Sequence, residues 1–203
     1  MNLPNKLSLL RICLIPIFIF FYLASFIPCG KIIATIIFIV AALTDMLDGK
    51  IARKHNLVTN LGKLLDPIAD KLLVTAGLLL VVVDFTIPHP YGVIIAIIII
   101  GRELLISAFR QIAASKNFVM AADKFGKIKM IIQVIALPML FVLSFLTYNI
   151  GDCFGVTLGD TALLVCQIIS YIFIGLATFF TILSGVNYLV KNREVLKEDK
   201  EQK

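Results

Sequence analysis

Six long runs of apolar residues, divided by short polar segments, account for most of this 203-residue chain. They cover residues 12–27, 32–47, 61–83, 91–114, 128–148 and 161–190. A helix needs roughly 20 apolar residues to cross the hydrocarbon core of a bilayer, and these runs approach or reach that length. The pattern predicts an all-α integral membrane protein with six transmembrane helices, forming one domain over residues 1–203.

The segment before the first run has a helical pattern of its own. Leu3, Leu7 and Leu10 share one helical face, and Lys6 lies off that face. An amphipathic segment of this kind predicts a short N-terminal interfacial helix. Such a helix would line the lipid entrance of a site or serve only as an anchor, and the sequence leaves both open.

Composition and charge agree with a membrane protein. The chain is 60% hydrophobic and only 16% charged, whereas a typical soluble domain is about 25% charged. Basic residues gather before the first run, in the second and fourth connections, and after the last run; the other connections carry Lys31 alone. By the positive-inside rule, both termini are expected in the cytoplasm. The net charge of +6 therefore has a topological explanation and does not indicate nucleic-acid binding. A cleaved signal peptide would spoil this alternation.

The four cysteines show no metal-site spacing. Cys13 and Cys166 fall inside apolar runs, where packing is the expected role. Cys29 and Cys153 fall in predicted outer connections, where a disulfide between them is possible but not required by the sequence.

Charged residues interrupt the second, third and fourth runs at similar depths. Measured from the outer edge at ~1.5 Å per residue, Asp45, Asp70 and Arg102 all lie about 17–20 Å into the membrane. Ionisable residues at such depth usually face a bundle interior or a water-filled cavity. We therefore expect a polar cavity that opens to the cytoplasm and is roofed by apolar helix ends.

Two pairs of aspartates carry the strongest chemical signal. Asp45 and Asp48 are three residues apart, and Asp66 and Asp70 are four apart, so each pair shares a helical face. Carboxylates are hard ligands suited to Mg²⁺, Mn²⁺ or Ca²⁺, and two such ions would balance four aspartates. A two-metal site can orient a phosphate group. There are two alternatives: Asp66 could be a helix N-cap before Pro67, and Asp45 and Asp48 could simply end a span. Each accounts for only part of the set.

Small residues and an arginine accompany the aspartates. Gly49, Ala52 and Gly62 lack bulky side chains, so a planar or phosphate group can approach the backbone there. Arg53 offers a fork of donors for a phosphate oxygen. These residues extend the predicted metal site toward a nucleotide or pyrophosphate.

The combined pattern, D-x-x-D-G-x-x-A-R, eight residues, then G-x-x-x-D-x-x-x-D, resembles the signature of the CDP-alcohol phosphatidyltransferase family. The chain carries all of its positions, at Asp45, Asp48, Gly49, Ala52, Arg53, Gly62, Asp66 and Asp70. The resemblance implies that the four aspartates bind two divalent cations, Mg²⁺ or Mn²⁺, and that Asp70 is also the general base. It implies that Gly49, Ala52 and Gly62 form the cytidine site, with Arg53 near the pyrophosphate. It also implies a homodimer.

Residues 2–11, 101–110 and 126–129 resemble the branch of this family that uses glycerol 3-phosphate as acceptor. A dianionic phosphate needs cations, and the candidates near the cytoplasmic ends of the fourth and fifth runs are Arg102, Arg110, Lys127 and Lys129. Each has an alternative explanation. Arg102 could pair with a carboxylate near Glu103, Arg110 could reach lipid headgroups, and the two lysines could be topological charges.

The expected function is transfer of the phosphatidyl group from CDP-diacylglycerol to glycerol 3-phosphate at the cytoplasmic face of the cell membrane. The products would be phosphatidylglycerophosphate and CMP, within phospholipid biosynthesis. Inositol phosphate, serine or phosphatidylglycerol are the alternative acceptors. A divalent-cation transporter could use the same carboxylates, but it would give Gly49, Ala52, Arg53 and Gly62 no obvious role.

Overall fold

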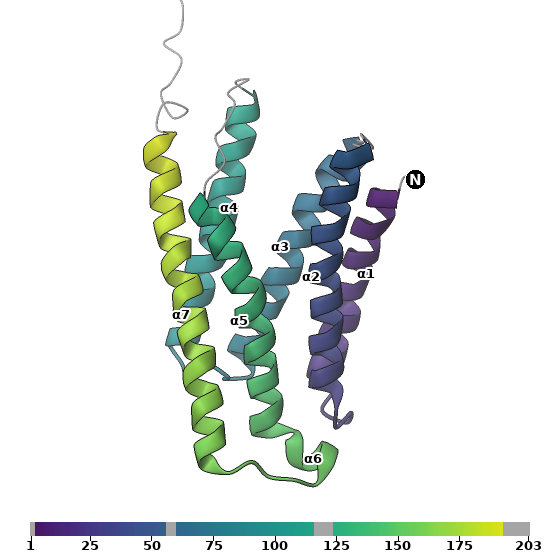
Figure 1. Cartoon of the computed structure of the whole chain (residues 1–203), viewed down its shortest axis with the longest axis vertical. Helices are drawn as coiled ribbons and strands as arrows, with labels where there is room; N and C mark the ends of the chain where they lie inside the picture. The colour runs from purple at the N-terminus through teal and green to yellow at the C-terminus, as the bar shows by residue number, and fades with distance from the viewer. Residues whose placement is uncertain (1–2, 56–59, 116–123, 193–203) are drawn as a thin grey trace, which may run out of the picture.

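A computed structural model shows a helical bundle (Figure 1). It describes the backbone of residues 3–55, 60–115 and 124–192, and side chains within 6–44, 68–69, 71–113 and 125–192. The helices are α1 (Leu3–Leu23), α2 (Gly30–His55), α3 (Asn60–Val83), α4 (Tyr91–Ser115), α5 (Lys124–Tyr148), α6 (Ile150–Phe154) and α7 (Asp160–Lys191). No strand occurs within these ranges. The all-α prediction is confirmed.

Four of the described helices are long and apolar enough to cross a membrane. Their apolar windows are Lys6–Leu23, Tyr91–Ala113, Phe125–Tyr148 and Asp160–Lys191. In α2 and α3 the apolar stretches are shorter, Gly30–Thr44 and Lys71–Val83, because the aspartate-bearing segments occupy the remainder of each helix. These lengths indicate a multi-pass membrane protein, and the count of six spans stays a prediction.

The N-terminal segment is not a separate interfacial helix in the structure. Residues 3–23 form one continuous helix, α1. Its buried face carries Ser8 and Arg11, whereas Leu9 and Leu10 are exposed. In a bilayer the apolar side chains can face lipid while polar ones turn inward, which explains why the leucine pattern did not mark the packed face.

The helices form two groups that meet along α2 and α5. In Figure 1, α1, α2 and α3 stand on the right, and α4, α5 and α7 on the left. Aromatic rings join the groups: the ring centroid of Phe141 of α5 lies 5.4 Å from that of Phe18 of α1 and 5.2 Å from that of Phe38 of α2. The start of α1 and the end of α7 lie at the same end of the bundle, opposite α6.

A buried polar cluster lies at the α6 end. The Lys31 ammonium is 2.7 Å from both Asp84 Oδ2 and Ser144 Oγ, and Tyr22 Oη donates to Asp84 Oδ2 at 3.2 Å. Lys31 is only 9% exposed. Its charge is balanced by Asp84, which explains why one basic residue can sit among connections that are otherwise free of them.

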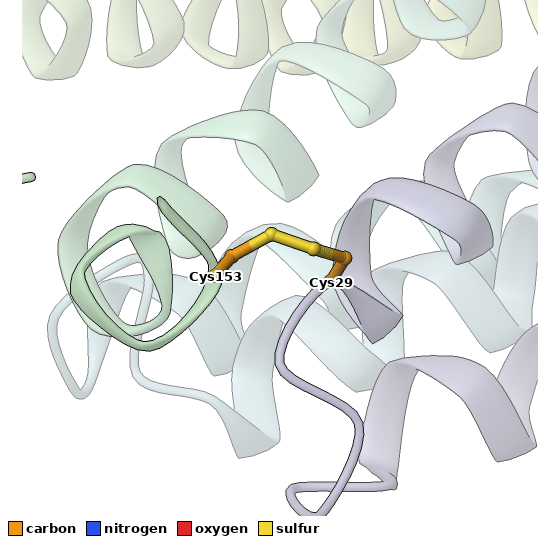
Figure 2. The surroundings of a disulfide bond; sticks show 2 residues. All are labelled: Cys29 and Cys153. Carbon is orange, nitrogen blue, oxygen red and sulfur yellow. A yellow bond between two sulfur atoms is a disulfide. The ribbon is translucent and has the colours of Figure 1, made fainter. Parts of the chain in front are cut away.

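A disulfide joins Cys29, just before α2, to Cys153 in α6 (Figure 2). The two Cα atoms are 5.4 Å apart, within the usual range for such a bond. The neighbouring Gly30 is required by close packing, since a Cβ there would lie 2.5 Å from the Phe21 carbonyl oxygen. The disulfide settles the question that the sequence left open, while Cys13 and Cys166 remain thiols.

Candidate active site

The signature positions lie on two helices that pack against each other. Positions 45, 48, 49, 52 and 53 belong to α2, and positions 62, 66 and 70 belong to α3. Their side chains lie outside the described residues, so the predicted metal and nucleotide contacts stay predictions. The donor set itself fits hard divalent cations, because it consists of four carboxylates on neighbouring helices.

A cavity of about 270 Å³ brings together the four cations predicted from the sequence. Arg102 and Arg110 of α4 and Lys127 and Lys129 of α5 all line it. The remaining walls include residues of α3 and α7, so four helices enclose the space. These are the only predicted site side chains that lie within the described residues.

Both arginines are anchored to α7. Arg102 Nη2 donates to Ser184 Oγ, and Arg110 Nε donates to Tyr188 Oη at 3.2 Å. The Arg110 guanidinium also lies 5.7 Å from the centroid of the Tyr188 ring, a cation–π distance. Ser184 and Tyr188 are four residues apart and share a helical face. Gly185 leaves room, since a Cβ there would lie 3.3 Å from Arg102 Cγ.

Lys129 is buried and has a counter-charge. Only 3% of this residue is exposed, and its ammonium pairs with the Glu103 carboxylate. Arg102 Nη1 lies 3.8 Å from the other Glu103 oxygen. Lys129 therefore lies in the cavity wall rather than at the surface, and its role as a phosphate ligand stays a prediction. The alternative pairing of Arg102 near Glu103 is present in the structure, and Arg102 also lines the cavity.

The cavity is strongly electropositive. Its lining contains four basic side chains and one carboxylate, Glu103. Lys127 is exposed, so the cavity reaches solvent on that side. A small dianion would offset most of the excess positive charge, and the arginine forks match the oxygens of a phosphate group.

Several residues of this region were not found from the sequence. Tyr188 belongs to no recognised motif, and its contact with Arg110 follows only from the packing of α7 on α4. Gln133 lies one turn beyond Lys129 on the same face of α5, so helical periodicity could have marked it. Arg11 is fully buried in α1, and Lys71 of α3 donates to Ser107 of α4; the sequence pattern indicated neither arrangement.

Comparison with known proteins gives a consistent result. The profile of the CDP-alcohol phosphatidyltransferase family matches residues 1–183. The chain is 41% identical over 208 aligned residues to the CDP-diacylglycerol–glycerol-3-phosphate 3-phosphatidyltransferase of Bacillus subtilis (strain 168), covering 97% of each chain. It is 35% identical to the protein of the same name from Rickettsia bellii, covering 92% of this chain and 93% of the relative. It is 41% identical to the CDP-diacylglycerol–glycerol-3-phosphate 3-phosphatidyltransferase 2 of Arabidopsis thaliana, covering 68% of this chain and 64% of the relative.

The helical architecture, the complete signature on α2 and α3, and the match over most of the length agree with one another. The chain belongs to the CDP-alcohol phosphatidyltransferase family.

Proposed function

We propose that this protein transfers the phosphatidyl group of CDP-diacylglycerol to glycerol 3-phosphate, with release of CMP. The main support for glycerol 3-phosphate as the acceptor is that four cations line one cavity: Arg102, Arg110, Lys127 and Lys129. Serine brings no phosphate to such a cavity, and phosphatidylglycerol brings a diester with a single charge. The names of the relatives specify the same donor and acceptor.

The acceptor phosphate is held by the cationic cavity. The arginines supply paired donors in fixed directions because α7 anchors them, and the lysines supply localised charge. Holding the acceptor in one orientation beside the donor lipid removes much of the entropic barrier to a reaction between two molecules. The protein's main contribution is therefore positioning and charge neutralisation.

The reacting hydroxyl lies toward α3. Val74 lines the cavity, and position 70 is one helical turn before it on the same face of α3. Asp70 accepts the proton of the primary hydroxyl as that oxygen bonds to the phosphorus bearing diacylglycerol. The bond from this phosphorus to the CMP oxygen breaks, so one ester bond replaces one anhydride bond.

Asp45, Asp48, Asp66 and Asp70 would hold two divalent cations, Mg²⁺ or Mn²⁺. When bound, these cations neutralise the pyrophosphate and stabilise the oxygen on which CMP departs. Gly49, Ala52 and Gly62 leave space for the cytidine. Arg53 binds the pyrophosphate through its donor fork.

The proposed topology has six spans, both termini in the cytoplasm and the active site on the cytoplasmic face of the cell membrane. The Cys29–Cys153 disulfide supports it from the opposite end, because disulfides persist in oxidising compartments outside the cytoplasm. α1 begins and α7 ends at the other end of the bundle (Figure 1). We also propose a homodimer, on the family resemblance, which light scattering of the purified protein would test.

The test is reconstitution with defined substrates. Purified protein, CDP-diacylglycerol, glycerol 3-phosphate and Mg²⁺ or Mn²⁺ should yield CMP and phosphatidylglycerophosphate, and Asp70→Asn should abolish the yield. Inositol phosphate, serine and phosphatidylglycerol serve as competing acceptors. Preferred transfer to one of these, or CMP release that survives Asp70→Asn, would contradict the proposal.

A further inference from the structure

One side chain in the wall of the cationic cavity makes no side-chain hydrogen bond within the part of the chain that the structure describes. Gln133 of α5 lines the cavity and is only 2% exposed. Neither its amide nitrogen nor its amide oxygen has a hydrogen-bond partner among the described residues. Buried polar groups nearly always have a hydrogen-bond partner, so an unpaired amide beside a cavity indicates that a bound ligand supplies the partner.

The position of Gln133 separates it from the charged part of the cavity. It lies one turn beyond Lys129 on the same face of α5, about 6 Å along the helix axis. The next turns of α5 bury Leu137 and Leu140 completely. The neutral amide therefore stands between the cations that suit a phosphate and the apolar core that closes the inner end.

The chemistry of an amide matches an uncharged alcohol. A glutamine side chain both donates and accepts hydrogen bonds, and a hydroxyl group does the same. A molecule that carries a phosphate group and a free hydroxyl on a nearby carbon would satisfy the cations and the amide together. Glycerol 3-phosphate has such a hydroxyl at C2, which takes no part in the transfer.

On the basis of the proposed function, we infer that Gln133 binds the C2 hydroxyl of the acceptor and thereby determines specificity for a glycerol phosphate. The amide turns toward the cavity, where its oxygen accepts a hydrogen bond from the hydroxyl and its N–H donates one to the hydroxyl oxygen. A site with a buried polar group rejects an acceptor that lacks the matching hydroxyl, because the group is then left unpaired.

The experiment compares two acceptors that differ only in this hydroxyl. Glycerol 3-phosphate and 3-hydroxypropyl phosphate, which lacks the C2 hydroxyl, are supplied to the detergent-solubilised protein with CDP-diacylglycerol, and kcat/KM is measured from CMP release. The wild-type protein should prefer glycerol 3-phosphate by about tenfold, because the analogue leaves a buried amide unpaired, which costs more than the net value of one hydrogen bond. Gln133→Met, of similar length but apolar, should reduce this preference to about twofold or less.

Thermal unfolding separates a ligand-binding amide from a structural one. Gln133→Met removes an unpaired buried amide, so its unfolding temperature should equal or exceed that of the wild type. Leu137→Met is the matched control, since it changes a fully buried residue one turn further along α5 and outside the cavity lining. This control should keep the wild-type preference between the two acceptors.

The possible failures are distinguishable. If the wild type transfers to neither acceptor, the proposed function fails and the assignment of Gln133 fails with it. If the wild type transfers and Gln133→Met lowers kcat/KM equally for both acceptors, only the assignment of Gln133 is overturned. A lower unfolding temperature with an unchanged preference would likewise overturn it and indicate a structural amide.

Discussion

The ammonium group of Lys129 on α5 donates to the carboxylate of Glu103 on α4, inside the wall of the cationic cavity. The same carboxylate lies 3.8 Å from Arg102 Nη1. One acidic side chain therefore offsets the repulsion between two cations while the cavity holds no anion. Glu103 is thus a positioning residue for the proposed acceptor site.

The first prediction concerns this pair. Glu103→Gln removes the carboxylate that pairs with the buried Lys129 ammonium, and loss of one partner of a buried pair costs on the order of 3 kcal/mol. Thermal unfolding in detergent should show a clear loss of stability. Glu103→Gln combined with Lys129→Met should recover much of it, and a double variant as unstable as the sum of the singles would show that the two residues act independently.

A second prediction concerns the anchor of Arg110. Tyr188→Phe removes the hydroxyl that accepts from Arg110 Nε and leaves the ring in place. A net hydrogen bond is worth about 1 kcal/mol, so KM for glycerol 3-phosphate should rise roughly fivefold while kcat changes little. Tyr171→Phe is the control, because it loses a comparable hydroxyl that donates to the Thr86 carbonyl in the α3–α4 connection. Equal KM values for the two variants would refute the anchoring role.

Much of this region could be predicted from the sequence, because charged residues inside apolar runs are expected to face the bundle interior or a water-filled cavity. The family resemblance and a place near the cytoplasmic ends of the fourth and fifth runs were enough to group Arg102, Arg110, Lys127 and Lys129. Their partners were not predictable, since Ser184 and Tyr188 reach them only through the packing of α7 on α4. The burial of Arg11 was missed for the same reason.

The α6 end shows the same limit. Lys31 pairs with Asp84, 53 residues away, and a pattern of local spacing carries no information about such a contact. Cys29 and Cys153 could be recognised as candidates on the same predicted side, but their approach depends on how α6 folds back toward α2. Helices follow from local periodicity, whereas pairs between helices follow from tertiary packing.

The third prediction tests the Lys31 cluster. Lys31→Met leaves the Asp84 carboxylate with hydroxyl donors only, so stability should fall by about 3 kcal/mol. The KM for glycerol 3-phosphate should not change, because the cluster lies at the α6 end of the bundle. The cavity is lined by the start of α5 and the end of α7, which lie at the opposite end (Figure 1). A variant with wild-type thermal stability would contradict the role of this cluster as a structural link.

The fourth prediction concerns the disulfide. Cys29 and Cys153 are 124 residues apart, and closing a loop of this length restricts the unfolded chain, which in the entropic model is worth about 5 kcal/mol. Cys29→Ser should lower the unfolding temperature, and reducing agent should have the same effect on the wild type but none on the variant. Cys13→Ser is the control, since Cys13 is a free thiol. Equal unfolding temperatures with and without reductant would show that the bond adds no stability.

The central claim is that the cationic cavity binds the acceptor phosphate, and the most direct test is the kinetics of Arg110→Gln with each substrate varied in turn. Loss of a charge-assisted hydrogen bond should raise KM for glycerol 3-phosphate by about 10-fold or more, while KM for CDP-diacylglycerol stays within about twofold. Lys191→Gln, an exposed cation at the end of α7 outside the cavity lining, should leave both values unchanged. An increase confined to CDP-diacylglycerol, or none for either substrate, would contradict the account.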